Sequence, residues 1–139
     1  SLKNSKDDTL SALASKSLKE VKYHLRHSKN WLIRLGDGTE FSKEKVQKSL
    51  EDIWQYTHDM FSMDEIDNNM YRLNIGVNNS NLKVEWDRII NETLIEAKLV
   101  RPKDGYNAKG GKNGMHTEHL GFLLAEMQFL QRAYPNAKW

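Results

Sequence analysis

The residues best suited to chemistry in this sequence are histidines and carboxylates, because there is no cysteine to act as a nucleophile or thiolate ligand. Di-iron centres in helical bundles use paired Glu-x-x-His motifs, since a spacing of three places both ligands on one helix face. No such motif occurs here, and Glu20 and His24 are four residues apart. His116 and His119 are three apart, but Glu118 is the only further ligand nearby.

Nucleophilic catalysis has no sequence support either. The Gly-x-Ser-x-Gly elbow that presents a reactive serine is missing from the sequence. The residues alone therefore predict no catalytic group and no metal site in this chain.

A basic, glycine-rich stretch at residues 103–114 is the best candidate for ligand binding. It differs from a nucleotide-binding loop, because an extra glycine separates Gly110 from Lys112, and Asn113 stands where a magnesium-binding Ser or Thr would be. The stretch leads into a helix expected near residue 117, whose free amide groups favour anions. The favoured interpretation is a mobile solvated loop, and an anion site at Lys109, Lys112 and His116 is the alternative.

The longest element that could position such groups is a helix predicted over residues 8–35. Its apolar side chains recur with a period of 3.6 on one broad stripe. Asp7 or Asp8 can cap its first turn, and Gly36 can end it in the left-handed conformation. His24 and Ser28 fall within the apolar stripe, so we expect both to be buried polar residues with a structural role.

Four further helices are predicted from the same periodicity and from capping residues. They cover residues 42–61, 64–73, 80–98 and 117–133, with the first of these antiparallel to helix 8–35. On the last helix, His119 and Glu126 share a face with phenylalanines, so we expect a buried pairing across the bundle or a subunit boundary; a ligand or catalytic pair is the alternative. His58, near the edge of the second helix, is expected to be an ordinary surface histidine.

Composition limits the class of protein. The 139 residues are 38% hydrophobic with a mean hydropathy of −0.76, and both prolines lie outside the predicted helices, which favours one all-α domain. A net charge of +2 is too small to indicate nucleic acid or an anionic membrane as a partner. No apolar run approaches the ~20 residues needed to span a bilayer. With no cysteine and no signal peptide at the start, we expect a cytoplasmic protein.

Several segments resemble the PaaC family over nearly the whole chain. The family is that of the structural subunit of bacterial phenylacetyl-CoA epoxidase, a multicomponent oxygenase of aerobic phenylacetate catabolism. The matching segments are residues 19–31 (KEVKYHLRHSKNW), 34–39 (RLGDGT), 110–121 (GGKNGMHTEHLG) and 124–132 (LAEMQFLQR), and the final Trp139.

The resemblance implies a ferritin-like helical bundle and a non-catalytic role. It implies pairing with a homologous catalytic A subunit that holds the di-iron centre, so this chain would carry no cofactor. His24 would then be a polar core residue in an altered remnant of a ligand helix. Coenzyme A thioester contacts through Lys109 or Lys112 are a further expectation.

The resemblance is to the C-terminal portion of longer family members. We therefore expect a piece of a longer subunit, with helix 8–35 as the last of four core helices and its leucine stripe promoting self-association. Two alternatives stay open: a ferritin-like iron protein in its own right, and a generic helical interaction module.

Overall fold

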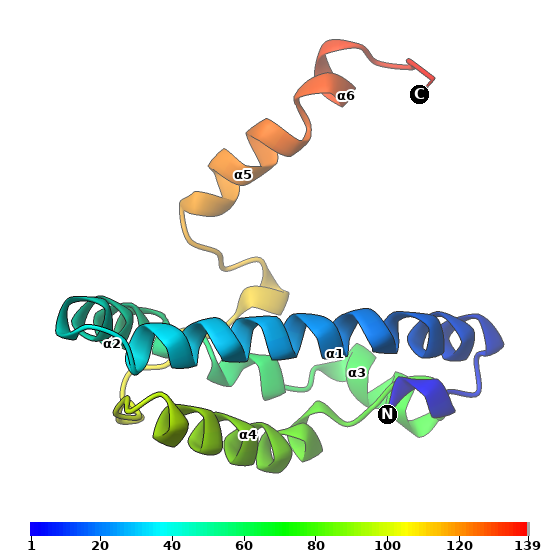
Figure 1. The fold of residues 1–139 in the computed structure, drawn as a ribbon. Coiled ribbons are helices and arrows are strands. Elements are labelled where there is room, and N and C mark those ends of the chain that lie inside the picture. Colours follow the sequence, from blue (N-terminus) through cyan, green and yellow to red (C-terminus); the bar gives the residue numbers. More distant parts are fainter. Residues whose placement is uncertain (139) are drawn as a thin grey trace. The chain divides into compact units, whose positions relative to one another are not determined.

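Every regular element in the part of the chain that the structure describes is helical. This structure is a computed structural model, and it describes residues 1–138 (Figure 1). The all-α class predicted from the sequence is confirmed. The elements in chain order are η1 (Leu2–Asn4), α1 (Asp8–Gly36), α2 (Glu40–Trp54), η2 (His58–Phe61), α3 (Glu65–Arg72), η3 (Asn79–Leu82), α4 (Lys83–Glu96), η4 (Gly111–Asn113), α5 (His119–Met127) and α6 (Phe129–Ala133).

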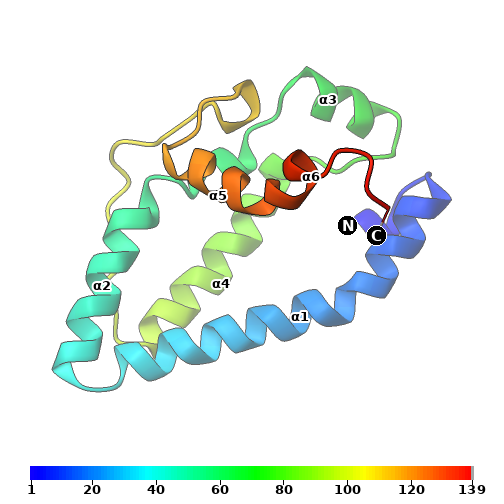
Figure 2. The same cartoon turned by 90° about the horizontal axis from the view of Figure 1, so that it is seen from above.

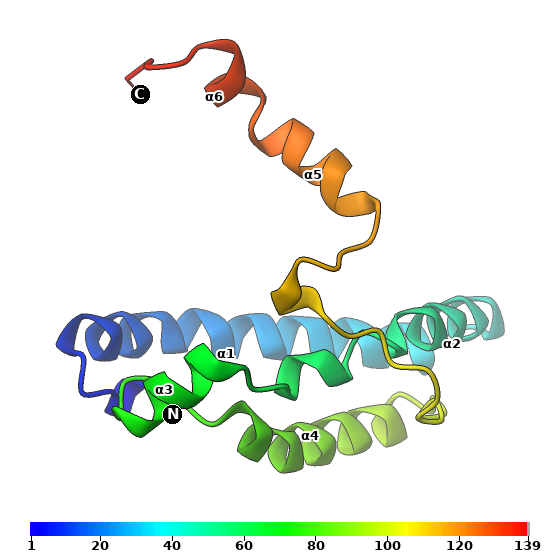
Figure 3. The same ribbon diagram turned by 180° about the vertical axis from the view of Figure 1, so that it is seen from behind.

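The chain forms two compact units, where the sequence suggested a single domain. The first is Ser1–Ala108 and contains α1 to α4, and the second begins at Lys109 and contains α5 and α6. Within the first unit, α3 and α4 lie on the same side of α1 (Figures 1 and 3). None of the helices within residues 1–138 is both long enough and apolar enough to cross a membrane.

The start of α1 is fixed by the capping interaction that the sequence predicts. The Asp7 carboxylate accepts a hydrogen bond from the Leu10 amide at 2.8 Å, which satisfies one of the unpaired donors of the first turn. The segment before the cap is tied to a distant loop, because the Lys6 amide donates to the Asn74 carbonyl at 2.9 Å. The Ser5 hydroxyl donates to the Ile75 carbonyl at 2.7 Å. The α1 N-terminus is thus anchored to the segment after α3.

The other end of α1 meets α2 and α4, and the small core of the first unit lies there (Figure 2). We expected Gly36 to end α1 in the left-handed conformation, but it is the last residue of the helix and has no positive φ. Its role is close approach: a Cβ added there would lie 2.3 Å from the Ala97 carbonyl oxygen. Buried Leu94, Ala97 and Leu99 form the core, with the partly buried Leu32, Ile33, Val46, Leu50 and Ile90 around them.

The α4 C-terminus reaches this core through a reversal of the chain. Lys98 adopts a left-handed conformation with φ 55°, and the Leu99 amide donates back to the Leu94 carbonyl at 2.9 Å. This is the arrangement of a Schellman motif, in which an apolar contact accompanies the returning chain. The Lys98 ammonium also lies 2.6 Å from the Asp37 carboxylate, so it links this turn to the end of α1.

The second helix is shorter than predicted and begins earlier. The sequence indicated residues 42–61 with Ser42 as the cap, but α2 is capped by Thr39, whose hydroxyl accepts from the Ser42 amide at 3.2 Å. Ser42 instead donates its hydroxyl to the Leu35 carbonyl at 2.8 Å and so satisfies the end of α1. The helix ends at Trp54, where Thr57 turns the chain by donating both its amide and its hydroxyl to the Trp54 carbonyl.

The remaining predicted helices differ mainly at their ends. Asp64 caps α3 in a capping box with Asp67, as the pattern at 64–73 indicated. The predicted helix 80–98 is a 3₁₀ turn followed by α4, which ends at Glu96. The predicted helix 117–133 begins later and is divided at Gln128, whose φ of −100° and ψ of 1° leave the α region.

Candidate functional site

The first unit contains a polar and aromatic junction between α2, α4 and the segment that follows α4. At its centre the Arg101 guanidinium lies 5.0 Å from the Trp54 ring centroid and 5.7 Å from that of Trp86. The two indole rings are themselves 5.8 Å apart. A guanidinium over two indole faces is attracted by both ring quadrupoles, so Arg101 fastens the segment after α4 to both helices.

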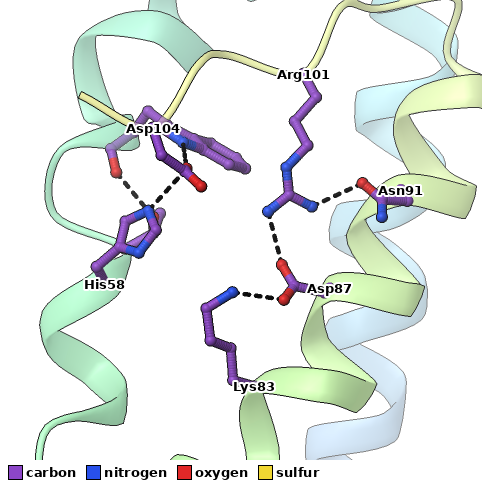
Figure 4. Close-up of polar contacts among 8 residues, drawn as sticks. His58, Lys83, Asp87, Asn91, Arg101 and Asp104 are labelled. Atoms are coloured by element: carbon purple, nitrogen blue, oxygen red, sulfur yellow. Dashed lines mark hydrogen bonds and ion pairs between the residues drawn. The ribbon is translucent and has the colours of Figure 1, made fainter.

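Arg101 is also held by hydrogen bonds to α4 (Figure 4). Its Nη2 donates to Asp87 Oδ1 at 2.6 Å, and its Nη1 donates to Asn91 Oδ1 at 2.7 Å. The second oxygen of Asp87 accepts from the Lys83 ammonium. The bond from Lys83, followed by that from Arg101, holds the pKa of the Asp87 carboxyl below its usual value.

Asp104 forms the other half of the junction. Its Oδ1 accepts a hydrogen bond from the buried Trp54 indole at 3.0 Å and lies 3.0 Å from His58 Nε2 (Figure 4). The bond from Trp54 is the largest cause that lowers the pKa of the Asp104 carboxyl, and His58 adds to it. The expectation that His58 is an ordinary surface residue is wrong, because its side chain is only 18% exposed and bridges two distant segments.

A pocket of about 410 Å³ lies between α2 and the segment after α4. Its volume falls within the range of small-molecule sites. However, Gln47 in its wall already exchanges two hydrogen bonds with the Val100 backbone, and Arg101 is engaged by α4. The polar groups here therefore act mainly to attach the segment to α2. The lining includes Gln47, Trp54, Gln55, Arg101, Lys103 and Tyr106.

The carboxylates of the junction are engaged by cations and ring N–H groups rather than directed at a common point. Within residues 1–138, no group of three or more histidine or acidic side chains gathers in a way that could hold a metal ion. The donor set on these residues does not fit a di-iron centre, which needs carboxylates and histidines from facing helices directed at one site.

The four polar residues expected to be buried are exposed. His24 and Ser28 lie on an open face of α1, and His119 and Glu126 are exposed on α5. Their burial within a longer subunit or at a subunit boundary stays a prediction, because periodicity identifies an apolar face without supplying the helix that covers it. Helix α1 is packed chiefly at its ends, so the middle of its stripe has no cover from the first unit.

The candidate anion site lies in the second unit. Lys109, Lys112 and His116 are all exposed on the loop that precedes α5. Gly110 and Gly114 take left-handed conformations, with φ of 94° and 80°, and bracket the short helix η4. The helix that follows begins at His119, two residues later than expected, and Glu118 makes no side-chain cap there. Anion binding at this loop remains a prediction.

The sequence reasoning missed Arg101, Asp104, Trp54 and Trp86 as a unit. The sequence does indicate the part of this junction that lies on α4. Lys83, Asp87 and Asn91 recur every four residues and so form one polar row on that helix. Trp54 and its partner Asp104 are 50 residues apart in the chain, and local periodicity cannot pair positions at that separation.

The fold and the junction define an all-α protein whose helices are joined through intramolecular ion pairs. The family model described as "Phenylacetic acid catabolic protein" matches residues 1–139. The C subunit of the 1,2-phenylacetyl-CoA epoxidase of Escherichia coli (strain K12) is 42% identical over 138 residues, which cover 99% of this chain and 56% of that protein. The chain belongs to the phenylacetic acid catabolic protein family, and it spans a little over half the length of this relative. The helical fold agrees with the ferritin-like bundle expected for the family.

Replacing Arg101 tests whether the junction stabilises the first unit. We expect Arg101→Met to lower the free energy of unfolding by about 2 kcal/mol, because it removes two charge-assisted hydrogen bonds and two cation–π contacts. The matched control is Arg88→Met, since Arg88 pairs only with exposed Glu85 and Glu92 on the same helix and should contribute under about 1 kcal/mol. Urea unfolding followed by tryptophan fluorescence measures both, and equal losses would contradict the role of Arg101.

The lowered pKa of Asp104 predicts a pH dependence of stability. Because the pKa is lower in the folded protein than its unfolded value of about 3.9, the ionised carboxylate stabilises the fold above that value. This contribution is lost as the pH falls through the folded pKa. We expect Asp104→Asn to be less stable than the unsubstituted protein at pH 6, with the difference shrinking below about pH 4. Unfolding titrations across this range measure it; a constant difference would count against the ionised form.

Proposed function

We propose that this chain is part of the structural, non-catalytic subunit of a phenylacetyl-CoA epoxidase. In this role it acts in aerobic phenylacetate degradation, beside a homologous catalytic A subunit that carries the di-iron centre and epoxidises the ring of phenylacetyl-CoA. The observation that carries the proposal is the 42% identity to a protein named as the C subunit of such an epoxidase, which extends over 99% of the chain.

The arrangement of charged groups supports a structural role. Asp87 is held between Lys83 and Arg101, and Asp104 between Trp54 and His58. Carboxylates engaged in this way stabilise the contacts between helices and are poor candidates for metal ligands. His24, the histidine nearest in pattern to a ligand helix, lies exposed on α1.

The exposed faces of the helices support a place within a larger assembly. Among the described residues, the only buried hydrophobic side chains are Trp54, Leu94, Ala97 and Leu99. Large apolar residues are exposed along α1 and α5, and soluble monomers rarely present contiguous apolar surface on this scale. Further parts of the subunit or the A subunit would cover these faces.

The subunit role predicts how iron and activity divide between the chains. We expect the chain to co-purify with a co-expressed A subunit, and iron to follow the A subunit rather than this chain. Conversion of phenylacetyl-CoA to its epoxide, measured by mass spectrometry with the remaining components supplied, should require both.

The alternatives give different results in the same experiment. Stoichiometric iron together with turnover in this chain alone would favour a ferritin-like iron protein. Association with the A subunit without any effect on turnover would favour a generic helical interaction module.

Coenzyme A contact at the glycine-rich loop is a second part of the proposal. We expect the double substitution Lys109→Glu and Lys112→Glu to weaken phenylacetyl-CoA binding to the assembled complex roughly tenfold, because the thioester carries phosphates that cationic side chains attract. Calorimetric titration measures the dissociation constant. The control, Lys6→Glu with Lys48→Glu, makes the same change in charge on exposed lysines of the first unit. If both variants bind phenylacetyl-CoA with equal affinity, the proposed contact through Lys109 and Lys112 is wrong.

A further inference from the structure

An exposed row of aromatic rings follows the outer side of α1. The rings of Tyr23 and His27 are stacked with centroids 6.0 Å apart, and His27 meets Trp31 edge-on at 6.5 Å. These residues are four apart, so they lie on one ridge of the helix. Tyr23 and Trp31 are 51% and 49% exposed. The row lies away from Leu32 and Gly36, which face the core.

Two arginines flank this row. The Arg26 guanidinium lies 5.8 Å from the Tyr23 ring centroid, and that of Arg34 lies 5.5 Å from the Trp31 ring centroid. Neither arginine forms an ion pair with an acid within residues 1–138. Between Lys16 and Arg34 the helix carries six lysines and arginines and a single acid, Glu20. Of these cations Lys29 is engaged by Glu96. The outer side of α1 is therefore a cationic surface with an aromatic centre.

We infer that this row, defined by Tyr23, Arg26, His27, Trp31 and Arg34, is the docking surface for an acidic helix of a partner subunit. The inference rests on the proposed function, and the partner it commits to is the catalytic A subunit. A ridge of residues four apart fits the groove of another helix, which is the commonest mode of helix packing. Tyrosine, tryptophan and arginine are also the residues that carry most binding energy in protein interfaces.

The charge of the surface selects the occupant. A partner helix with carboxylates beside its groove would pair with Arg26 and Arg34, which lie about 12 Å apart along α1 at 1.5 Å per residue. A second copy of the chain docked through the same surface would place like charges against each other.

Nucleic acid is the weaker alternative for this surface. Single strands bind by stacking bases on open aromatic faces, whereas here guanidinium groups lie over the Tyr23 and Trp31 rings. The net charge of the whole chain is only +2, so the surface is a local feature rather than part of a generally basic protein. Figure 2 shows α1 along an edge of the first unit.

Charge reversal tests this inference with the purified chain and the purified A subunit. We expect Arg26→Glu with Arg34→Glu to weaken association with the A subunit by at least about tenfold, measured by surface plasmon resonance with the A subunit immobilised. Lys6→Glu with Lys48→Glu, which changes the net charge equally elsewhere, should leave the affinity within about twofold. Raising sodium chloride from about 0.1 M to about 1 M, which shortens the screening length from about 10 Å to about 3 Å, should weaken the unsubstituted complex and affect the reversed variant little.

A second pair of variants separates docking from folding. Tyr23→Ala with Trp31→Ala removes exposed rings, so circular dichroism should retain the helical signal while association falls. If the unsubstituted chain binds the A subunit and the arginine reversal changes nothing, the inference is wrong and the proposed function stands. If the unsubstituted chain fails to bind the A subunit, both are wrong. Self-association or single-stranded DNA binding that is lost on arginine reversal, with A-subunit binding intact, would also overturn the inference.

Discussion

The structure of the first unit depends on the close approach of two backbone segments at Gly36 and Ala97. A side chain at position 36 would bring its Cβ within 2.3 Å of a backbone oxygen, and backbone cannot yield as a flexible side chain can. Because this position is glycine, the ends of α1 and α4 come together and bury Leu94 and Leu99 between them. The ion pair of Lys98 with Asp37 then holds the turn in place from the solvent side. A single residue without a side chain thus determines where three helices meet.

Away from that joint, directional polar contacts fix the arrangement more than apolar packing does. Arg101 lies against two indole rings while its nitrogens bond to Asp87 and Asn91, so both its distance and its orientation are set. Asp104 similarly connects Trp54 with His58. Such contacts specify geometry without enclosing much volume. This explains how α2 and α4 keep defined positions while large apolar residues on α1 remain open.

The local features of this fold could be predicted from the sequence, because they are determined by residues close together in the chain. Asp7 and Asp64 cap their helices as their types and positions indicate, and the periodicity of α1 gives its length to within one residue. The junction could not be predicted, since Trp54 and Asp104 meet across 50 positions. His24 shows the complementary limit. Local periodicity places it in an apolar stripe, but burial depends on which neighbour covers the stripe, and that information is not carried by the helix itself.

Helix α1 presents three chemically different sides. One side of α1 packs against α2 and α4 at the C-terminal end of the helix. A second side exposes Val21, His24 and Ser28. A third side carries the aromatic and cationic row. A helix that served only the core of this chain would need one apolar side and would otherwise be evenly polar. Instead α1 carries both an apolar stripe and a cationic row, and the docking proposed above would cover the second with an acidic helix. Since binding to the native state stabilises it by mass action, the docking proposed above would make the stability of the chain depend on the concentration of the partner as well as on its own contacts. The joint at Gly36, the anchored N-terminus and the pair of Lys29 with Glu96 are the contacts with which the chain itself holds α1 in place.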